Sequence, residues 1–390
     1  MSKSRVVIVT RTFWPLVGAA ETAAARLAVG LVEAGRPVTV LTARWQKQWP
    51  SSIRFHDALV ERLSPRPDGR WAEWRYQHAV GQGLRRRAAT LGVVYVSDLR
   101  QEASTALYSV GRKVPVVLKV QAAGPPIGDS PPLDILHRLL SRHRAGAAAL
   151  VCGCETTRQE IAAAGFPDHR IHVIPDGVAT LSQRTTKTRA DARAMLADAN
   201  NTLRLPEWAP LAVYLGRLAG DRGLEYLVAA WPPIARQWPN ARLWFVGEGP
   251  FRDSLRRQIA GLKLSGQAVL VGRFDHVEDL LAAADVLVYP GPRDGPSMAV
   301  AEAMGAGLPV IAADCVGHRI LIEHDHTGLL VPPGNIEGLS EALVRVFGDP
   351  IAADRLGRDA QTHARRHFAL AQMVDQHVTL FKALAPVPPK

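Results

Sequence analysis

The densest group of residues able to do chemistry lies between positions 292 and 311, where a turn leads into an apolar helix and then a buried strand. Asp294 lies in the turn, Glu302 lies inside the helix, and Ser297 between them is a favourable N-cap residue. Amides at such a helix start form an anion site that the helix dipole favours. A carboxylate on an almost wholly apolar helix needs a donor, and a ligand hydroxyl is one candidate. The pattern fits a site for a sugar, a phosphate and a ribose, although an ordinary turn with Glu302 paired to an arginine explains the same residues.

Two arginines lie in the second half of the chain where a phosphate site is expected. Arg217 follows a predicted strand directly, and Arg222 opens the next helix. Two cations that flank a helix start can hold a diphosphate, because the guanidinium group binds phosphate oxygens in pairs. Two solvated arginines are the alternative. Gly247 begins a Gly-Glu-Gly-Pro turn after another predicted strand, which by itself indicates only a tight turn.

Short apolar runs alternate with amphipathic helical stretches along the whole chain, which predicts α/β units with parallel sheets. We expect an N-terminal Rossmann-like domain over residues 1–180, a polar linker over 181–210 and a second such domain over 211–365. A C-terminal helix and tail, residues 366–390, is expected to pack back on the first domain. In doubly wound sheets ligands bind at the carboxyl ends of the strands, and the motifs above all lie just after strands.

These motifs, taken in order, resemble those of the family 4 retaining glycosyltransferases, also called glycosyl transferases group 1. The resemblance implies the GT-B fold, in which two doubly wound domains face each other across a cleft, and a catalytic centre without metal or cofactor. It implies that Asp294, which replaces the usual Glu, contacts the donor sugar, and that Glu302 binds the nucleotide ribose. Arg217 and Arg222, the latter replacing a Lys, then hold the diphosphate. The other expected donor-binding residues are Gly18, Gly247, Gly295, Pro296, Ser297 and Met298.

The main departure from the family follows the strand that ends at Val120. Many members have a cleft histidine there, whereas this chain has Gln121. Retaining enzymes of this fold are thought to need no protein base, because the donor phosphate takes the acceptor proton, so this change leaves catalysis possible. Lys119, Gln121 and Asp129 are the candidates for the catalytic role, and a strand-end cation reaching for solvent explains Lys119 equally well.

Composition limits the possible partners. The chain has 390 residues, a formal charge of +11 and three cysteines, too few for a disulfide framework, and it lacks an apolar run long enough to span a bilayer. We therefore expect a cytoplasmic protein. Residues 44–87 interleave four Trp with ten Lys and Arg and only four acids, which suits an anionic membrane surface or a lipid-phosphate acceptor. A solvated basic face is the alternative, and the sequence lacks the motifs of nucleic-acid-binding proteins.

The sequence thus predicts a retaining glycosyltransferase that moves a sugar from a nucleotide-diphospho-sugar to a glycan or lipid-linked acceptor, in cell-surface polysaccharide or glycolipid synthesis. It is expected to work at the inner face of the cell membrane or free in the cytoplasm. A sugar-nucleotide epimerase of the same fold is one alternative, and it would release free nucleotide without an acceptor. A non-catalytic glycan- or nucleotide-binding relative is the other.

Overall fold

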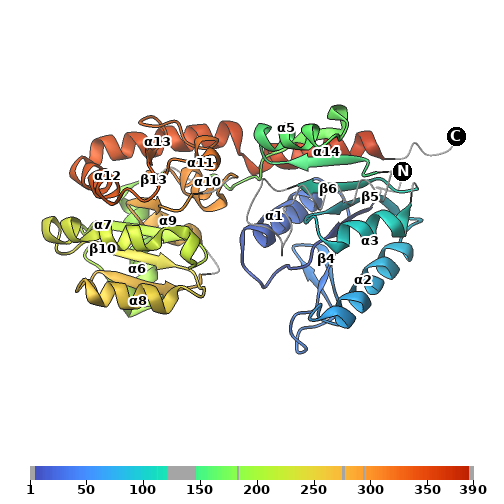
Figure 1. Ribbon diagram of the computed structural model, residues 1–390, viewed down its shortest axis with the longest axis horizontal. Coiled ribbons are helices and arrows are strands. Elements are labelled where there is room, and N and C mark those ends of the chain that lie inside the picture. The colour runs from blue at the N-terminus through green and yellow to red at the C-terminus, as the bar shows by residue number, and fades with distance from the viewer. Residues whose placement is uncertain are drawn as a thin grey trace. The chain divides into compact units, whose positions relative to one another are not determined.

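The computed structural model describes residues 5–111, 113–120, 146–181, 184–274, 277–292 and 295–385. The chain forms two compact α/β units, the first comprising Met1–Gly177 with Leu370–Lys390 and the second Val178–Ala369. Each unit has a sheet with helices packed against it, as Figure 1 shows. The expectation of two doubly wound α/β domains is confirmed.

The sheet of unit 1 has the strand order β3-β4-β2-β1-β5-β6-β7-β8. All neighbouring strands are parallel except β3 and β4. The order reverses between β1 and β5, which makes their carboxyl ends the switch point of this sheet. The strands are β1 (Arg5–Val9), β2 (Val38–Ala43), β3 (Ser52–Phe55), β4 (Ala58–Leu63), β5 (Leu91–Val96), β6 (Val116–Val120), β7 (Ala149–Cys152) and β8 (Ile171–Val173).

Helices cover both faces of this sheet, because successive strand residues point to opposite sides. On β1, Val6 and Ile8 join a core with α1 and α14, whereas Val7 and Val9 join a separate core with α2, α3 and α5. Both faces being covered explains why the central strands are apolar throughout. The helices are α1 (Ala19–Glu33), α2 (Arg70–Arg85), α3 (Gln101–Val110), α5 (Glu155–Ala163) and α14 (Leu370–Leu384).

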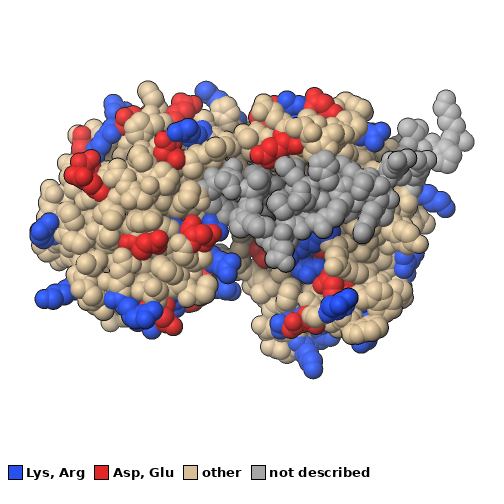
Figure 2. Space-filling model, in the orientation of Figure 1, with Lys and Arg blue, Asp and Glu red and all other residues tan. Residues whose placement is uncertain are grey.

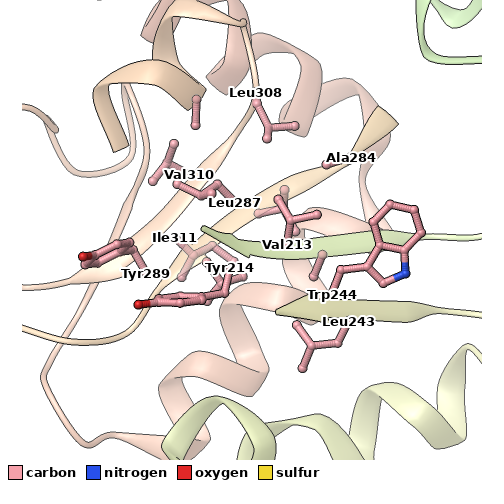
Figure 3. Packing of buried hydrophobic residues seen from close by; sticks show 14 of the residues in the cluster. Val213, Tyr214, Leu243, Trp244, Ala284, Leu287, Tyr289, Leu308, Val310 and Ile311 are labelled. Atoms are coloured by element: carbon pink, nitrogen blue, oxygen red, sulfur yellow. The ribbon is translucent and has the colours of Figure 1, made fainter. Parts of the chain in front are cut away.

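The sheet of unit 2 is parallel, with the order β11-β10-β9-β12-β13-β14. Its switch point lies between β9 and β12, where Val213, Leu287 and Ile311 pack in one continuous core (Figure 3). Its strands are β9 (Leu211–Leu215), β10 (Arg242–Val246), β11 (Ala268–Gly272), β12 (Val286–Tyr289), β13 (Val310–Ala313) and β14 (Leu329–Val331). Its helices are α6 (Thr186–Ala199), α7 (Leu224–Gln237), α8 (Arg252–Gly261), α9 (Val277–Ala283), α10 (Met298–Gly305), α11 (Val316–Arg319), α12 (Ile336–Gly348) and α13 (Pro350–His367).

The stretch 181–210, expected from its polarity to be a linker, carries helix α6 and clusters with unit 2. Asp285, just before β12, explains why so polar a helix packs there. Its carboxylate accepts a hydrogen bond from Arg193 at 2.9 Å, and Arg189 on the same helix lies 2.9 Å from it. Arg184 and the amide of Leu211 bind the same carboxylate at 3.3 and 2.8 Å. The polar character of this segment therefore reflects a buried ion cluster.

The C-terminal residues return to unit 1. The amide of Val178 donates to the carbonyl of Phe368 at 2.8 Å. The segment by which the chain enters unit 2 therefore lies beside the segment by which it leaves. Beyond that point α14 packs on α1, where Val374 contacts Gly30 so closely that a Cβ there would come within 2.2 Å of it. Unit 1 is therefore built from both ends of the sequence. Among the described residues, each helix is too short or too polar to cross a lipid bilayer.

Candidate functional site

Three loops meet at the carboxyl edge of the unit 2 sheet, around its switch point. Gly247, at the end of β10, has φ 140° and lies so near the loop after β9 that a Cβ would come within 1.9 Å of the carbonyl of Gly216. Gly223, with φ 63°, also lies close to the backbone after β12, because a Cβ there would come within 2.9 Å of the Pro290 carbonyl. Side chains at these two positions would separate the loops. The glycines thus bring the arginine-bearing loop between the other two.

The two candidate phosphate-binding arginines differ in their surroundings. Arg217 is exposed, and no described residue forms an ion pair or a side-chain hydrogen bond with its guanidinium group. Arg222 is mostly buried, lies 3.4 Å from Asp221 and donates a 3.5 Å hydrogen bond to the Tyr289 hydroxyl. Its Nε is buried without a hydrogen-bond partner. Both cations therefore have donor groups to offer an anion at the switch point.

Ser297 occupies the N-cap position of α10 with extended backbone, as the sequence predicts, and its carbonyl accepts the first helical hydrogen bond from Ala301. Its buried side chain makes no capping bond. The amides at this helix start are therefore not satisfied by the cap residue, which is the condition for an anion site. Glu302 and Met298 lie half-buried on the same helix. Gly295 and Pro296, also half-buried, lead into it.

The remaining candidates are in unit 1 or outside the described residues. Gly18 lies at the start of α1, where the carboxylate of Glu21 closes over it, so a Cβ at Gly18 would come within 2.4 Å of a carboxylate oxygen. Lys119, at the end of β6, is buried and its ammonium is bound by Asp176. The ammonium of Lys119 is thus already paired. Asp294, Gln121 and Asp129 lie outside the described residues.

A small cavity lies next to this Lys119–Asp176 pair, with room for about one water molecule. His377 of α14 is among the residues that line it, with its Nδ1 2.8 Å from the Met373 carbonyl and its Nε2 buried without a hydrogen-bond partner. The Tyr95 ring meets the imidazole edge-on at 5.4 Å. Burial in this apolar setting lowers the pKa of His377 to about 4. The imidazole is therefore neutral at physiological pH.

Sequence reasoning missed two tyrosines that support the arginine loop of unit 2. Tyr214 and Tyr289 lie on adjacent strands with ring centroids 5.5 Å apart, and Figure 3 shows their hydroxyls at the same edge of the core. The Tyr214 hydroxyl donates to the carbonyl of Arg217 at 2.9 Å, while that of Tyr289 accepts from Arg222. The available signal was a tyrosine near the end of each of two otherwise aliphatic strands. Such hydroxyls need a partner when buried, so they mark where a polar loop must lie.

No three His, Cys, Asp or Glu side chains of the described residues are grouped so as to hold a metal ion. Figure 2 shows that Lys and Arg side chains on the displayed face are scattered among acidic ones.

Two family models match the chain. A "Glycosyl transferase 4-like domain" matches residues 18–177, and "Glycosyl transferases group 1" matches residues 209–349. Similar curated proteins include the alpha-D-kanosaminyltransferase of Streptomyces kanamyceticus, 25% identical over 64% of each chain. A GDP-mannose-dependent alpha-(1-6)-phosphatidylinositol monomannoside mannosyltransferase of Mycobacterium tuberculosis is 29% identical over 61% of this chain and 63% of its own. The matches span less than two thirds of these relatives' lengths.

Solved structures match over almost the whole chain. HepE of Anabaena in complex with UDP-glucose has a TM-score of 0.77 and 19% identity, covering 97% of this chain and 100% of that one. Sucrose-phosphate synthase of Thermosynechococcus elongatus has a TM-score of 0.76 and 21% identity over 98% and 99% of the two chains. At these identities the likeness concerns the fold.

Proposed function

Since the chain belongs to the group 1 glycosyl transferases, we propose that it transfers a sugar from a nucleotide-diphospho-sugar, with retention and without a metal ion. The observation that carries the proposal is the switch point of unit 2. There the Arg217 guanidinium is exposed without a partner among the described residues, the buried Nε of Arg222 forms no hydrogen bond, and the Ser297 side chain does not cap α10. Cations and amides converging at one strand edge suit a diphosphate. HepE, which shares the fold, binds UDP-glucose.

Within this proposal, different residues bind the different parts of the nucleotide-sugar. Arg217 and Arg222 hold the diphosphate, together with the turn at Gly247. Glu302 accepts hydrogen bonds from the ribose hydroxyls, and Asp294 contacts the sugar. These roles rest on the resemblance to the family and on the positions of the described residues along one strand edge. The arrangement supplies positive charge where the leaving diphosphate develops negative charge.

We propose that the reaction needs no protein base. The acceptor hydroxyl oxygen attacks the anomeric carbon on the face from which the diphosphate leaves. The bond from that carbon to the phosphate oxygen breaks, and this oxygen takes the proton of the attacking hydroxyl. Retention follows because bond formation and bond cleavage occur on the same face. Lys119, whose ammonium is bound by Asp176, then serves to position the end of β6, and Gln121 and Asp129 remain the candidates for the catalytic role.

The acceptor in this proposal is a glycan or a lipid-linked sugar, bound by unit 1 next to an anionic membrane surface. The structural support is one face of α2, where Trp71 and Trp74 are 82% and 62% exposed. Arg70 and Arg75 beside them are exposed without an ion-pair partner among the described residues. Exposed indoles flanked by free arginines suit the headgroup region of anionic lipid.

Two other arginines of the same region are already engaged. Arg62 is buried, its guanidinium 5.2 Å from the Trp49 ring, and donates to the Trp14 carbonyl at 3.1 Å. Arg87 is bound by Glu61. The local charge of residues 44–87 therefore overstates what the surface offers.

A ligand screen followed by turnover assays tests the donor proposal. UDP-, GDP- and ADP-sugars should be compared by thermal shift, and nucleotide release from the stabilising sugar measured with and without lipid-linked acceptors. Release that depends on acceptor and persists in chelator supports the transferase. Release of free nucleotide without acceptor supports the epimerase, and binding without release supports a non-catalytic relative.

The phosphate clamp has a matched pair of variants. Arg217→Ala should weaken a nucleoside diphosphate at least several-fold in calorimetry and leave the nucleoside unchanged, because only the diphosphate contacts the guanidinium group. Arg256→Ala, which removes a 63% exposed arginine on α8, is the control. Equal effects of the two variants, or equal weakening of both ligands by Arg217→Ala, would place the diphosphate elsewhere.

A further inference from the structure

The switch point of unit 1 holds a carboxylate that the function above does not use. Asp98 follows β5 by two residues, and the neighbouring Ser97 joins this loop to the end of β1. The Ser97 amide and hydroxyl both donate to the Val9 carbonyl, at 3.0 and 3.2 Å. Asp98 therefore lies at the edge of the sheet where doubly wound folds bind ligands.

The Asp98 carboxylate is mostly buried yet accepts no hydrogen bond from any described residue. Its side chain is 17% exposed, and the cation within reach, Arg100, is 3.9 Å away and itself 40% exposed. Helix α3 begins at Gln101 with Arg100 as its N-cap residue, and that helix start has no side-chain cap. A carboxylate in such a setting normally collects several donors. Asp98 thus has no visible structural task and unused capacity to accept hydrogen bonds.

Apart from Arg100, two cations of the surrounding ion-pair network are bound by other acids. Arg11, after β1, is held by Glu102 at 2.7 Å and by Glu73 at 2.6 Å. Lys119 is bound by Asp176. Because these cations are occupied, they cannot turn toward Asp98 without breaking ion pairs of their own.

Two further buried polar atoms of this cluster have no partner. They are Oε2 of Glu102, whose side chain is 1% exposed, and the hydroxyl of the fully buried Tyr76. Arg11 lies over the Tyr76 ring at 6.0 Å, so both atoms belong to the same network as the Arg11 ion pairs. Buried polar atoms without partners are rare in folded proteins and mark sites that a ligand or water completes.

The charge of the cluster is negative, in contrast to the chain as a whole. Its acids are Glu21, Glu73, Asp98, Glu102 and Asp176, and its bases are Arg11, Arg100 and Lys119. Burial raises the pKa of Asp98. The nearby negative charges of Glu102 and Glu21 also raise it, whereas the positive charges of Arg100 and Lys119 lower it. The fold therefore holds Asp98 where its ionised form is disfavoured, which is common at binding sites and costs stability.

We propose that Asp98 binds the acceptor in unit 1 by accepting hydrogen bonds from a sugar hydroxyl or a protonated amino group. The proposal rests on the transferase function above and adds the chemistry of the acceptor group. The local excess of acids selects neutral and cationic groups and disfavours carboxylate or phosphate at this position. Any acid of the acceptor, such as a lipid phosphate, then binds away from Asp98.

Three monosaccharide probes test this chemistry on the full chain: methyl α-glucoside, glucosamine and glucuronate, titrated by ligand-observed NMR. The wild-type protein should bind glucosamine and the glucoside and bind glucuronate at least tenfold more weakly. Asp98→Asn should weaken glucosamine about tenfold, because a charge-assisted hydrogen bond is lost. Asp168→Asn, which neutralises a 66% exposed acid of unit 1, should change none of the three.

Two readouts separate this proposal from a structural role and from the transferase function. Asp98→Asn should keep or raise the unfolding temperature at pH 7, whereas loss of a structural carboxylate would lower it. Nucleotide-sugar binding should be unchanged, and its absence in both proteins would count against the transferase and not against Asp98. Equal titrations of wild type and Asp98→Asn, no binding of any probe to the wild type, or a preference for glucuronate would overturn the proposal.

Discussion

Acidification should destabilise unit 1 through His377. This histidine is 2% exposed on α14, packed against the rings of Tyr95 and Phe381, and its pKa lies at about 4 instead of 6.5, chiefly because of burial. Lys119 lowers the pKa further, while the Met373 carbonyl and Asp176 oppose the shift. In the unfolded chain His377 therefore binds a proton below about pH 6.5, whereas in the native protein it does so only below about pH 4. Stability must fall as the pH drops through that window.

The size of the effect follows from the shift. A difference of this size between the native and unfolded pKa corresponds to about 3 kcal/mol. About 2 kcal/mol of it should be lost between pH 7 and pH 4.5, because the native imidazole is still mostly neutral at the lower value. For a protein unit of ordinary stability, this is a substantial fraction of the free energy of unfolding.

Chemical denaturation at pH 7 and pH 4.5 measures this loss for the wild type and for His377→Asn, in which an amide nitrogen can still donate to the Met373 carbonyl. The variant should lose about 2 kcal/mol less on acidification, whatever its stability at pH 7. His172 and His363, whose pKa values burial also lowers, contribute equally to both proteins. His326→Asn, at an exposed position, is the control. Equal losses for wild type and His377→Asn would refute the reasoning.

Three further results are expected. Glu302→Gln should lower nucleotide affinity at least several-fold in calorimetry with the fold intact, since charge-assisted bonds to the ribose are worth roughly 1.5–3 kcal/mol; unchanged affinity would remove Glu302 from the site. Asp285→Ala should cost unit 2 about 3–5 kcal/mol in denaturant unfolding, because it strands Arg184, Arg189 and Arg193; a loss below about 1 kcal/mol would contradict this account. Replacing Trp71 and Trp74 by Ala should weaken sedimentation with acidic vesicles, and equal binding of the wild type to neutral ones would exclude the membrane role.

The elements of unit 2 could be predicted from the sequence, because strands that are covered on both faces are continuous apolar runs. Helix α7 spans Leu224–Gln237, and its apolar residues follow the helical period that the sequence shows there. Strands β3 and β4 were not anticipated, because this hairpin lies at the sheet edge and its burial alternates. A two-residue turn through His56 and Asp57, both at positive φ, gives no glycine signal.

The candidate site divides in the same way. The positions of Arg217, Arg222 and Ser297 after strands could be predicted, because loops after parallel strands must meet at one edge. The pairing of Lys119 with Asp176 joins residues 57 positions apart, and the sequence offers no period or spacing that connects them. Asp98 could not be singled out either, because its distinguishing property is that no described residue donates a hydrogen bond to its carboxylate. Such properties appear only when the neighbours of each group are known.

The return of α14 to unit 1 affects how the protein is made. During synthesis, unit 1 leaves the ribosome first but lacks the helix that covers α1 and part of its core until the last residues emerge. Unit 2 is contiguous, from Val178 to Ala369, so all its strands are available earlier. Domains usually fold in order from the N-terminus, but here unit 2 can complete its fold before unit 1. A nascent chain stopped just after Ala369 should hold a finished unit 2 and an open unit 1, with its α14-binding surface available to chaperones.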